Sequence, residues 1–176
     1  MAKKKLIAVY NVSQTDYPIS LVSNIDFYDN IVIDGKDKIK GFNYQFDTVG
    51  EHLVEIELKG DTIGDEAFYQ RPELISVIIG NGVTSIGEYA FYECENLKSV
   101  TIPDSVTTIN RGAFALCYEL TNVTIGSGVE RIGDYAFSYC CGLTSVTIPN
   151  GVISVGSAGS NVFCNCEKLE QIYIKH

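Results

Sequence analysis

Cysteine and histidine are the residues of this chain whose types could support nucleophilic, redox or metal chemistry. The sequence of 176 residues holds six cysteines and two histidines, His52 and His176. A thiol nucleophile requires a histidine within hydrogen-bond reach. His52 stands in a predicted turn between strands and His176 at the end of the sequence, so neither is expected beside a cysteine. We therefore assign no catalytic residue and expect no enzyme.

The cysteines also lack the spacing of a metal site. Structural zinc sites use cysteine pairs separated by about two to four residues, whereas Cys140 and Cys141 are adjacent and Cys164 and Cys166 have one residue between them. Three cysteines instead recur every 23 residues: Cys94, Cys117 and Cys140. We predict no metal and no cofactor, and we predict free, buried thiols that act as small apolar side chains.

The cysteine spacing is part of a longer repeat. Four units begin at Ile63, Ile86, Ile109 and Ile132, and the second reads IGEYAFYECENLKSVTIPDSVTT. Each unit has an Ala-Phe pair followed six residues later by leucine. A fixed period in the twenties is typical of a solenoid, in which neighbouring coils bury each other's apolar faces.

Each unit predicts one strand and one short helical turn. Val100 and Ile102 alternate with Ser99 and Thr101, as in a strand with one inward face. The segment GEYAFYEC places apolar residues on one face of a helical turn. One column holds only glycine or asparagine, which predicts positive φ or a helix N-cap; its members are Gly64, Gly87, Asn110, Gly133 and Gly156. The expected fold is mainly β with short helical turns, in about five coils with a parallel sheet.

The repeat leaves residues 1–60 as a separate N-terminal region. Short alternating runs such as LIAVYNV and HLVEIELKG predict strands. The stretch YQFDTVGEHLVEIEL resembles the last hairpin of a PKD-like or immunoglobulin-like sandwich. We expect residues 1–60 to form a small β-sandwich-like domain or cap, and residues 61–176 to form the solenoid.

Charge and hydropathy exclude two classes of partner. The formal net charge is −9, and residues 61–176 carry six basic and thirteen acidic residues. Such a surface repels nucleic acid, which proteins bind through clustered lysine and arginine. No apolar run approaches the roughly 18 residues of a membrane helix, so membrane insertion is not expected. The apolar run Leu6–Tyr10 is too short for a secretory signal.

Two outward-facing sets of side chains are candidates for ligand binding. The predicted strands present a hydroxyl-rich strip that includes Thr101, Thr124 and Thr147. The predicted helical turns present tyrosines, with Tyr89 and Tyr135 in one column and Tyr69 and Tyr92 in another. Tyrosine is enriched at interfaces because it buries a large area while its hydroxyl stays in water. We predict that a tight-binding partner contacts the tyrosines and that the threonine strip makes weaker contacts.

The pattern IGxxAFxxCxxLxSVxIPxxVxx, from Ile63 to Ile174, resembles the 23-residue leucine-rich repeat of BspA-like surface proteins. That resemblance implies a right-handed leucine-rich repeat solenoid in an extracellular, non-catalytic protein that binds host or matrix proteins in adhesion. The expected function is therefore a surface-displayed module that binds protein or glycan. The alternative is a structural virion or appendage protein that carries the same repeats and assembles through its N-terminal domain.

Location and assembly follow from the same two alternatives. The protein is expected at the cell surface or outside the cell if a signal peptide has been removed, and otherwise in a virion or in the cytoplasm. The last unit, which ends with the strand Ile172–Ile174, lacks a recognisable cap. Homo-oligomers can therefore form through this uncapped edge, guarded only by Lys175 and His176, or through the N-terminal domain.

Overall fold

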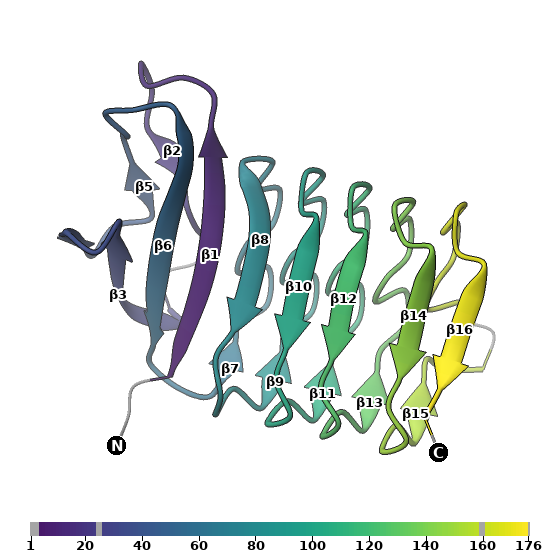
Figure 1. Ribbon diagram of the computed structural model, residues 1–176. Coiled ribbons are helices and arrows are strands. Elements are labelled where there is room, and N and C mark those ends of the chain that lie inside the picture. The colour runs from purple at the N-terminus through teal and green to yellow at the C-terminus, as the bar shows by residue number, and fades with distance from the viewer. Residues whose placement is uncertain (1–3, 24–25, 159–160, 176) are drawn as a thin grey trace.

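The computed structural model describes residues 4–23, 26–158 and 161–175, and all of its regular elements are strands. The N-terminal strands form an antiparallel sheet (Figure 1). Its strands, in the order in which they lie side by side, are β1 (Lys5–Val12), β6 (Gly50–Leu58), β3 (Tyr28–Ile33) and β4 (Asp37–Ile39). A separate two-stranded ribbon joins β2 (Ile19–Ser20) to β5 (Asn43–Tyr44).

The hairpin predicted from YQFDTVGEHLVEIEL is wrong. In that hairpin the aromatic strand would pair with the strand that follows the glycine, but β6 pairs with β1 on one side and β3 on the other. Both edges of β6 are thus occupied, and β5 pairs with β2 instead. The alternation in β6 was read correctly, since Val54, Ile56 and Leu58 are buried.

The repeats form five coils, each with a short strand, a turn segment and a longer strand (Figure 1). The short strands are β7 (Thr62–Ile63), β9 (Ser85–Ile86), β11 (Thr108–Ile109), β13 (Arg131–Ile132) and β15 (Ser154–Val155). The longer strands are β8 (Leu74–Ile79), β10 (Ser99–Ile102), β12 (Asn122–Ile125), β14 (Ser145–Ile148) and β16 (Gln171–Ile174).

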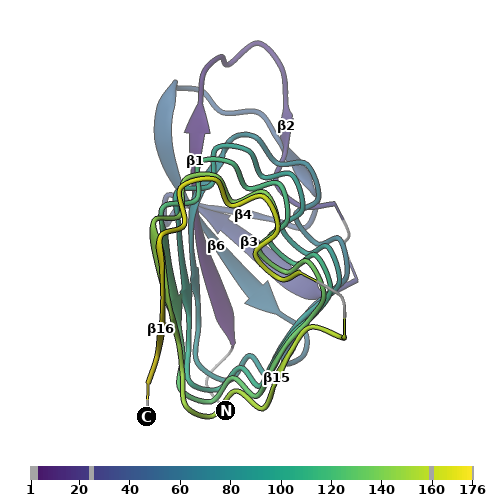
Figure 2. The same cartoon turned by 90° about the vertical axis from the view of Figure 1, so that its right-hand side faces the viewer.

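Strand pairing between coils is parallel and follows the repeat. Ser99 of β10 pairs with Ser76 of β8 and with Asn122 of β12, so each partner is 23 residues away in the sequence. Between the last two coils Ser145 pairs with Gln171, because three extra residues are inserted there. The predicted solenoid with a parallel sheet is confirmed. Figure 2 looks along the stack, with β16 on one side of the coil and β15 near its lower corner.

The turn segments, residues 64–73, 87–96, 110–119 and 133–142, are successive tight turns rather than helical turns. In the second, Ala90 donates its N–H to the carbonyl of Gly87 and Tyr92 to that of Tyr89. Tyr89 and Glu93 have φ angles of 53° and 56°. A right-handed helix cannot continue through residues with positive φ. Alternate residues also donate to the next coil, as Tyr89 does to the carbonyl of Arg111.

The glycine column has a different cause from the one predicted. Within this column only Gly156 has a positive φ, and positive φ occurs two residues later, at Glu66, Tyr89, Gly112 and Tyr135. A Cβ atom at Gly87 would lie 2.6 Å from the backbone nitrogen of Asp65, and one at Gly133 would lie 2.6 Å from that of Arg111. Glycine at these two positions therefore allows successive coils to approach closely, whereas the third coil accommodates the side chain of Asn110 in the same column.

A ladder of phenylalanines runs through the core of the coils. Neighbouring rings lie 4.8, 5.0, 5.3 and 5.6 Å apart between centroids, with their planes within 10° of parallel. The ladder consists of Phe68, Phe91, Phe114, Phe137 and Phe163. All but Phe163 are fully buried. Truncation of such a ring to alanine typically costs about 3–5 kcal/mol.

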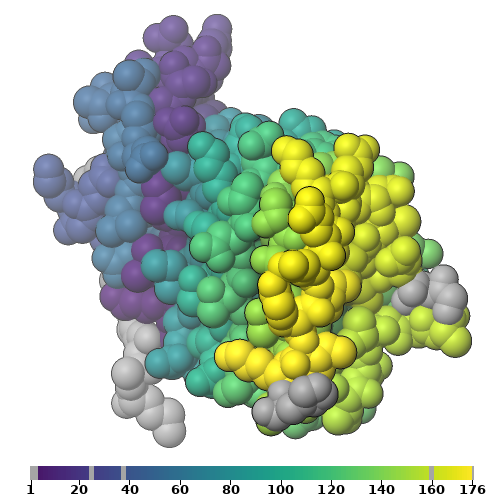
Figure 3. Space-filling view, turned by 45° about the vertical axis from the view of Figure 1, so that its right-hand side comes forward, coloured from purple at the N-terminus to yellow at the C-terminus, as the bar shows by residue number. Residues whose placement is uncertain are grey.

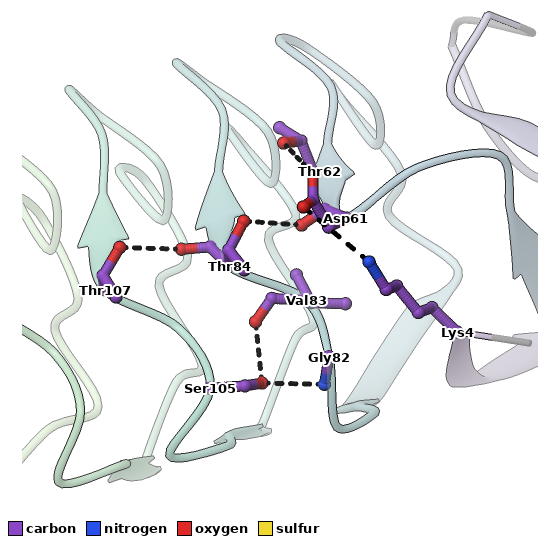
Figure 4. A network of polar contacts seen from close by, with 8 residues as sticks. All are labelled: Lys4, Asp61, Thr62, Gly82, Val83, Thr84, Ser105 and Thr107. Carbon is purple, nitrogen blue, oxygen red and sulfur yellow. Dashed lines mark hydrogen bonds and ion pairs between the residues drawn. The ribbon is translucent and has the colours of Figure 1, made fainter. Parts of the chain in front are cut away.

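The N-terminal sheet continues directly into the coils. β1 pairs antiparallel with β8, so the edge of the first long strand is covered. Phe27 packs edge-on against Phe68, with ring centroids 5.8 Å apart. Lys4 reaches Asp61 at 3.7 Å, and threonine hydroxyls then link the coils, since Thr84 donates to the carbonyl of Asp61 and Thr107 to that of Thr84 (Figure 4).

The opposite end of the solenoid is open in the described residues. Figure 3 shows the last coil at this end of the molecule. Every residue of β16 is exposed, including Ile172 and Ile174 at 51% and 63%. Val155 of β15 is exposed as well. His176, one of the two predicted guards of this edge, lies outside the described residues. Self-association through this edge or through the N-terminal region stays a prediction.

Candidate recognition surfaces

The repeated cysteines have a structural role that the sequence analysis described only in part. Each thiol is a hydrogen-bond donor to the carbonyl oxygen of the phenylalanine in the preceding coil, at 3.0–3.2 Å. The pairs are Cys94 with Phe68, Cys117 with Phe91, Cys140 with Phe114, and Cys166 with Phe137. A buried carbonyl without a donor is costly, so this column favours a small side chain that can donate.

Burial also makes these thiols weak nucleophiles. It raises the pKa of Cys94 to about 12 and the pKa of Cys166 to about 11. Burial likewise raises the pKa values of Cys117 and Cys140 well above that of an ordinary thiol. All six cysteines are free, and in the described part of the chain no group of three or more potential ligands is placed to hold a metal ion.

His52 belongs to the N-terminal sheet and is buried there. Its Nδ1 lies 2.7 Å from a carboxylate oxygen of Asp34, and its Nε2 lies 2.9 Å from the carbonyl of Thr48. The backbone N–H of Leu53 donates to the other oxygen of the same carboxylate. The two ring nitrogens therefore connect β6 to the residue that follows β3 and to the segment that precedes β6. His176 lies outside the described residues.

The predicted threonine strip lines a shallow groove on the outer face of the longer strands. Thr101 and Thr124 are exposed and pair in register, and Thr147 is half-buried. Ile78, in the same row, is 51% exposed. The groove has a volume of about 840 Å³ and also contacts Asp104 and Lys175. Its walls are mainly hydroxyls and aliphatic side chains, and it offers few large anchoring groups.

The tyrosines of the turn segments surround a second concavity, which we call the tyrosine pocket. Its volume is about 550 Å³. It is lined by Tyr89, Tyr92, Tyr118, Tyr135 and Tyr139, with Gly112, Ala115, Leu116 and Ser138. Three of the four predicted tyrosines thus lie around one pocket, and the threonines line a different one.

The pocket exists because the third coil has small side chains where the second coil has tyrosines. Gly112 stands between Tyr89 and Tyr135 in one column, and Ala115 follows Tyr92 in the other. A Cβ atom at Gly112 would lie 2.5 Å from the ring of Tyr89, so that ring leans across the third coil. Gly112 and Ala115 therefore form the floor, and tyrosines of the second and fourth coils form walls.

The tyrosine rings support one another. Tyr69 stacks on Tyr92 with centroids 5.0 Å apart, and Tyr89 meets Tyr92 edge-on at 5.5 Å. Tyr69 does not line the pocket but packs behind one of its walls. On the far wall, the guanidinium of Arg111 lies over the ring of Tyr135, 5.8 Å from its centroid.

Carboxylates act on the hydroxyls of this cluster. Burial, followed by the charges of Glu95 and Glu93, raises the pKa of Tyr118. Burial, followed by Tyr69 and Glu93, raises the pKa of Tyr92. Tyr92 and Tyr118 therefore stay neutral at physiological pH and present uncharged hydroxyls. The pocket has no nucleophile or metal ligand set and can bind by stacking, hydrogen bonding and charge.

Tyr118 and Tyr139 line the pocket but are not among the predicted binding residues. Neither shares a column with the four that were selected, and the sequence does not say how far a ring extends across coils. A comparison of columns would have found the site, because Gly112 interrupts one tyrosine column and Ala115 ends another in the same coil.

Comparison with known proteins agrees with this architecture. Residues 61–176 match six copies of the BspA-type leucine-rich repeat. The chain belongs to the BspA-type leucine-rich repeat family. It is 40% identical to a leucine-rich cell-surface protein of Faecalibacterium prausnitzii, with a TM-score of 0.59, over 68% of this chain and 32% of that one. It is 31% identical to a leucine-rich repeat protein of Bacteroides ovatus, with a TM-score of 0.60, over 74% of this chain and 31% of that one.

This BspA-type chain spans about a third of the length of those two proteins. A search of curated proteins found no significant match. Proteins built from this repeat are typically non-catalytic. In the described residues, no helix has the length and apolar character that crossing a membrane would require.

Proposed function

We propose that this BspA-type protein is a non-catalytic recognition module that is displayed on a surface and binds protein or glycan through its repeats. Membership of the family supports this proposal, as does the similarity to a protein described as a cell-surface protein. The same similarity favours a cell surface over the alternative of a virion component. Adhesion is the biological role that such a module would serve.

The observation that carries the proposal is the tyrosine pocket. Five tyrosines from three consecutive coils line one concavity, and the small side chains of Gly112 and Ala115 leave it open. Rigid aromatic side chains lose little conformational entropy on binding and bury a large area, so they dominate the binding energy of many interfaces. Stacking with Tyr69 and an edge-on contact with Tyr89 also hold the ring of Tyr92 in place.

The threonine groove is the weaker candidate. Each hydroxyl must exchange a bond to water for a bond to the ligand, with a net gain of only about 0.5–1.5 kcal/mol. The strip repeats threonine in three consecutive coils, so an extended ligand can shift along it by one coil with little change in contacts. We assign it to weak contacts with glycan or extended peptide.

The experiment is a binding screen of the purified chain against printed glycans and purified extracellular-matrix proteins, followed by two sets of variants on any partner that binds. One set combines Tyr89→Ala, Tyr92→Ala and Tyr135→Ala, and the other combines Thr101→Ala, Thr124→Ala and Thr147→Ala. Circular dichroism and melting establish that both remain folded. We expect the tyrosine set to lose binding and the threonine set to retain most of it.

Two results would contradict the proposal. Loss of binding in the threonine set alone would move the site to the sheet. Failure to bind any glycan or matrix protein would argue against a recognition role for this chain.

A further inference from the structure

The tyrosine pocket lies in an acidic part of the molecule. The turn segments of the three coils that form it carry five acidic residues and a single basic one: Glu88, Glu93, Glu95, Glu119, Asp134 and Arg111. Glu95 and Glu93 are close enough to act on the hydroxyl of Tyr118. An anionic ligand would therefore be repelled, and a cationic group would be attracted.

The shape of the pocket suits a flat group. The ring of Tyr89 leans over Gly112, whereas Ala115 and Ser138 leave the column of Tyr92 without a ring in the third and fourth coils. Successive coils are one stacking distance apart, since ring centroids in the core lie 5.0 Å apart from Phe91 to Phe114 and 5.3 Å apart from Phe114 to Phe137. One planar group between aromatic faces occupies a layer of comparable thickness, since stacked rings lie about 4.5–7 Å apart between centroids.

The aromatic walls favour a cation for a second reason. The face of a tyrosine ring carries negative electrostatic potential and attracts a cation placed over it. Arg111 already makes such a contact with Tyr135, so the cluster accommodates a guanidinium over one of its rings. The ring faces and the carboxylates thus both favour a cation at this site.

We propose that the tyrosine pocket binds an arginine side chain within a basic segment of a partner protein. This inference rests on the proposed function, in which the pocket is the recognition site. A guanidinium is planar, stacks on aromatic faces and is weakly hydrated, whereas the ammonium of lysine is compact and strongly hydrated. Arginine therefore suits a stacked site between tyrosines better than lysine does.

The test uses three short peptides with blocked ends that differ only at two positions, which hold arginine, lysine or citrulline. Citrulline has nearly the shape of arginine but no charge. Binding of each peptide to the complete chain is followed by calorimetry and by NMR of the tyrosine rings. We expect the arginine peptide to bind best and the citrulline peptide to bind roughly 5- to 30-fold more weakly, as expected for loss of a cation–π contact.

Three variants locate the effect. Glu93→Gln with Glu95→Gln removes two charges while keeping side chains of the same size, and it should weaken the arginine peptide severalfold without changing the citrulline peptide. Tyr135→Ala with Tyr139→Ala removes one wall and should abolish binding of both. Tyr17→Ala removes an exposed tyrosine of the N-terminal region, 66% exposed, and should leave binding unchanged.

Each contrary outcome is distinct. Equal binding of the arginine and citrulline peptides, both lost in the Tyr135 and Tyr139 variant, would overturn the cation proposal and leave the pocket as a recognition site for neutral ligands. If the arginine peptide still bound to the variant with Tyr135→Ala and Tyr139→Ala, the cation site would lie elsewhere and the proposal would be overturned. Absence of binding by all three peptides would also overturn it, and the partner screen would then decide the proposed function separately.

Discussion

At the level of single residues, the repeated cysteine combines two properties that few side chains share. It is small enough for a closely packed core, and its thiol donates to the carbonyl of the phenylalanine in the preceding coil. Alanine would fit but could not donate, and serine would bring a more strongly hydrated group into an apolar site. The cysteine column therefore reflects packing and hydrogen bonding rather than redox chemistry.

The thiols provide the first prediction. Because burial raises the pKa values of Cys94, Cys117 and Cys140, these thiols stay protonated in mildly alkaline buffer and should not react with a soluble disulfide reagent in the native protein. Cys141 and Cys164, which are only half-buried, should react. Peptide mapping by mass spectrometry identifies the labelled residues, with urea-unfolded protein as the control in which all six react.

A bridge between Cys94 and Cys117 in that experiment would contradict the account, as would labelling of Cys117 as fast as Cys141. The burial of these cysteines can be predicted from the sequence, because recurrence every 23 residues identifies a core position without knowledge of the fold. Its hydrogen bond was not predictable, because the carbonyl that accepts it belongs to another coil.

At the level of elements, the turn segment decides how closely coils can stack. Alternate N–H groups in this segment, such as those of Tyr89 and Phe91, donate to the next coil, and the side chains of Ala90 and Phe91 enter the core. Positive φ at Tyr89 and Glu93 allows consecutive tight turns within one segment. The helical spacing of the apolar residues in the sequence was real, but it arises from consecutive turns, which give a similar inward pattern over so few residues.

The glycine column gives the second prediction. Gly87→Ala would place a methyl group 2.6 Å from backbone atoms of the preceding coil, and such overpacking should reduce the free energy of unfolding by about 1–3 kcal/mol. Gly60→Ala is the matched control, because nothing lies within 4 Å of its Cβ position and its φ is not positive. It should be neutral or slightly stabilising. Urea unfolding measures both, and equal effects would refute the close-approach explanation.

At the level of the whole molecule, the N-terminal region is part of the same sheet as the coils. β1 pairs with β8, and the buried residues of both regions form one continuous core. The sequence indicated strands in residues 1–60 through their alternation, but it could not indicate their partners. The repeated units specify their own register, because each strand meets a copy of itself, whereas β1, β3 and β6 have no such copies.

The third prediction concerns this junction. Deletion of residues 1–60 removes β1 and exposes the edge of β8 and the first apolar layer, which includes Phe68. An uncovered strand edge promotes association, so the shortened chain should self-associate and melt at a lower temperature. Light scattering coupled to size-exclusion chromatography and thermal melting provide the measurements. A monomer with unchanged melting would show that residues 1–60 do not serve as a cap.

The central claim is that recognition depends on a gap in the tyrosine columns at the third coil. Ala115→Tyr tests it most directly, because the second coil already holds a tyrosine at the equivalent position, Tyr92, stacked on Tyr69. The added ring should extend this stack, fill the pocket and leave every existing tyrosine in place. We expect the variant to melt at the same temperature as the original chain or higher, and to lose binding of the partner found in the screen. Undiminished binding by a folded Ala115→Tyr variant would contradict the claim.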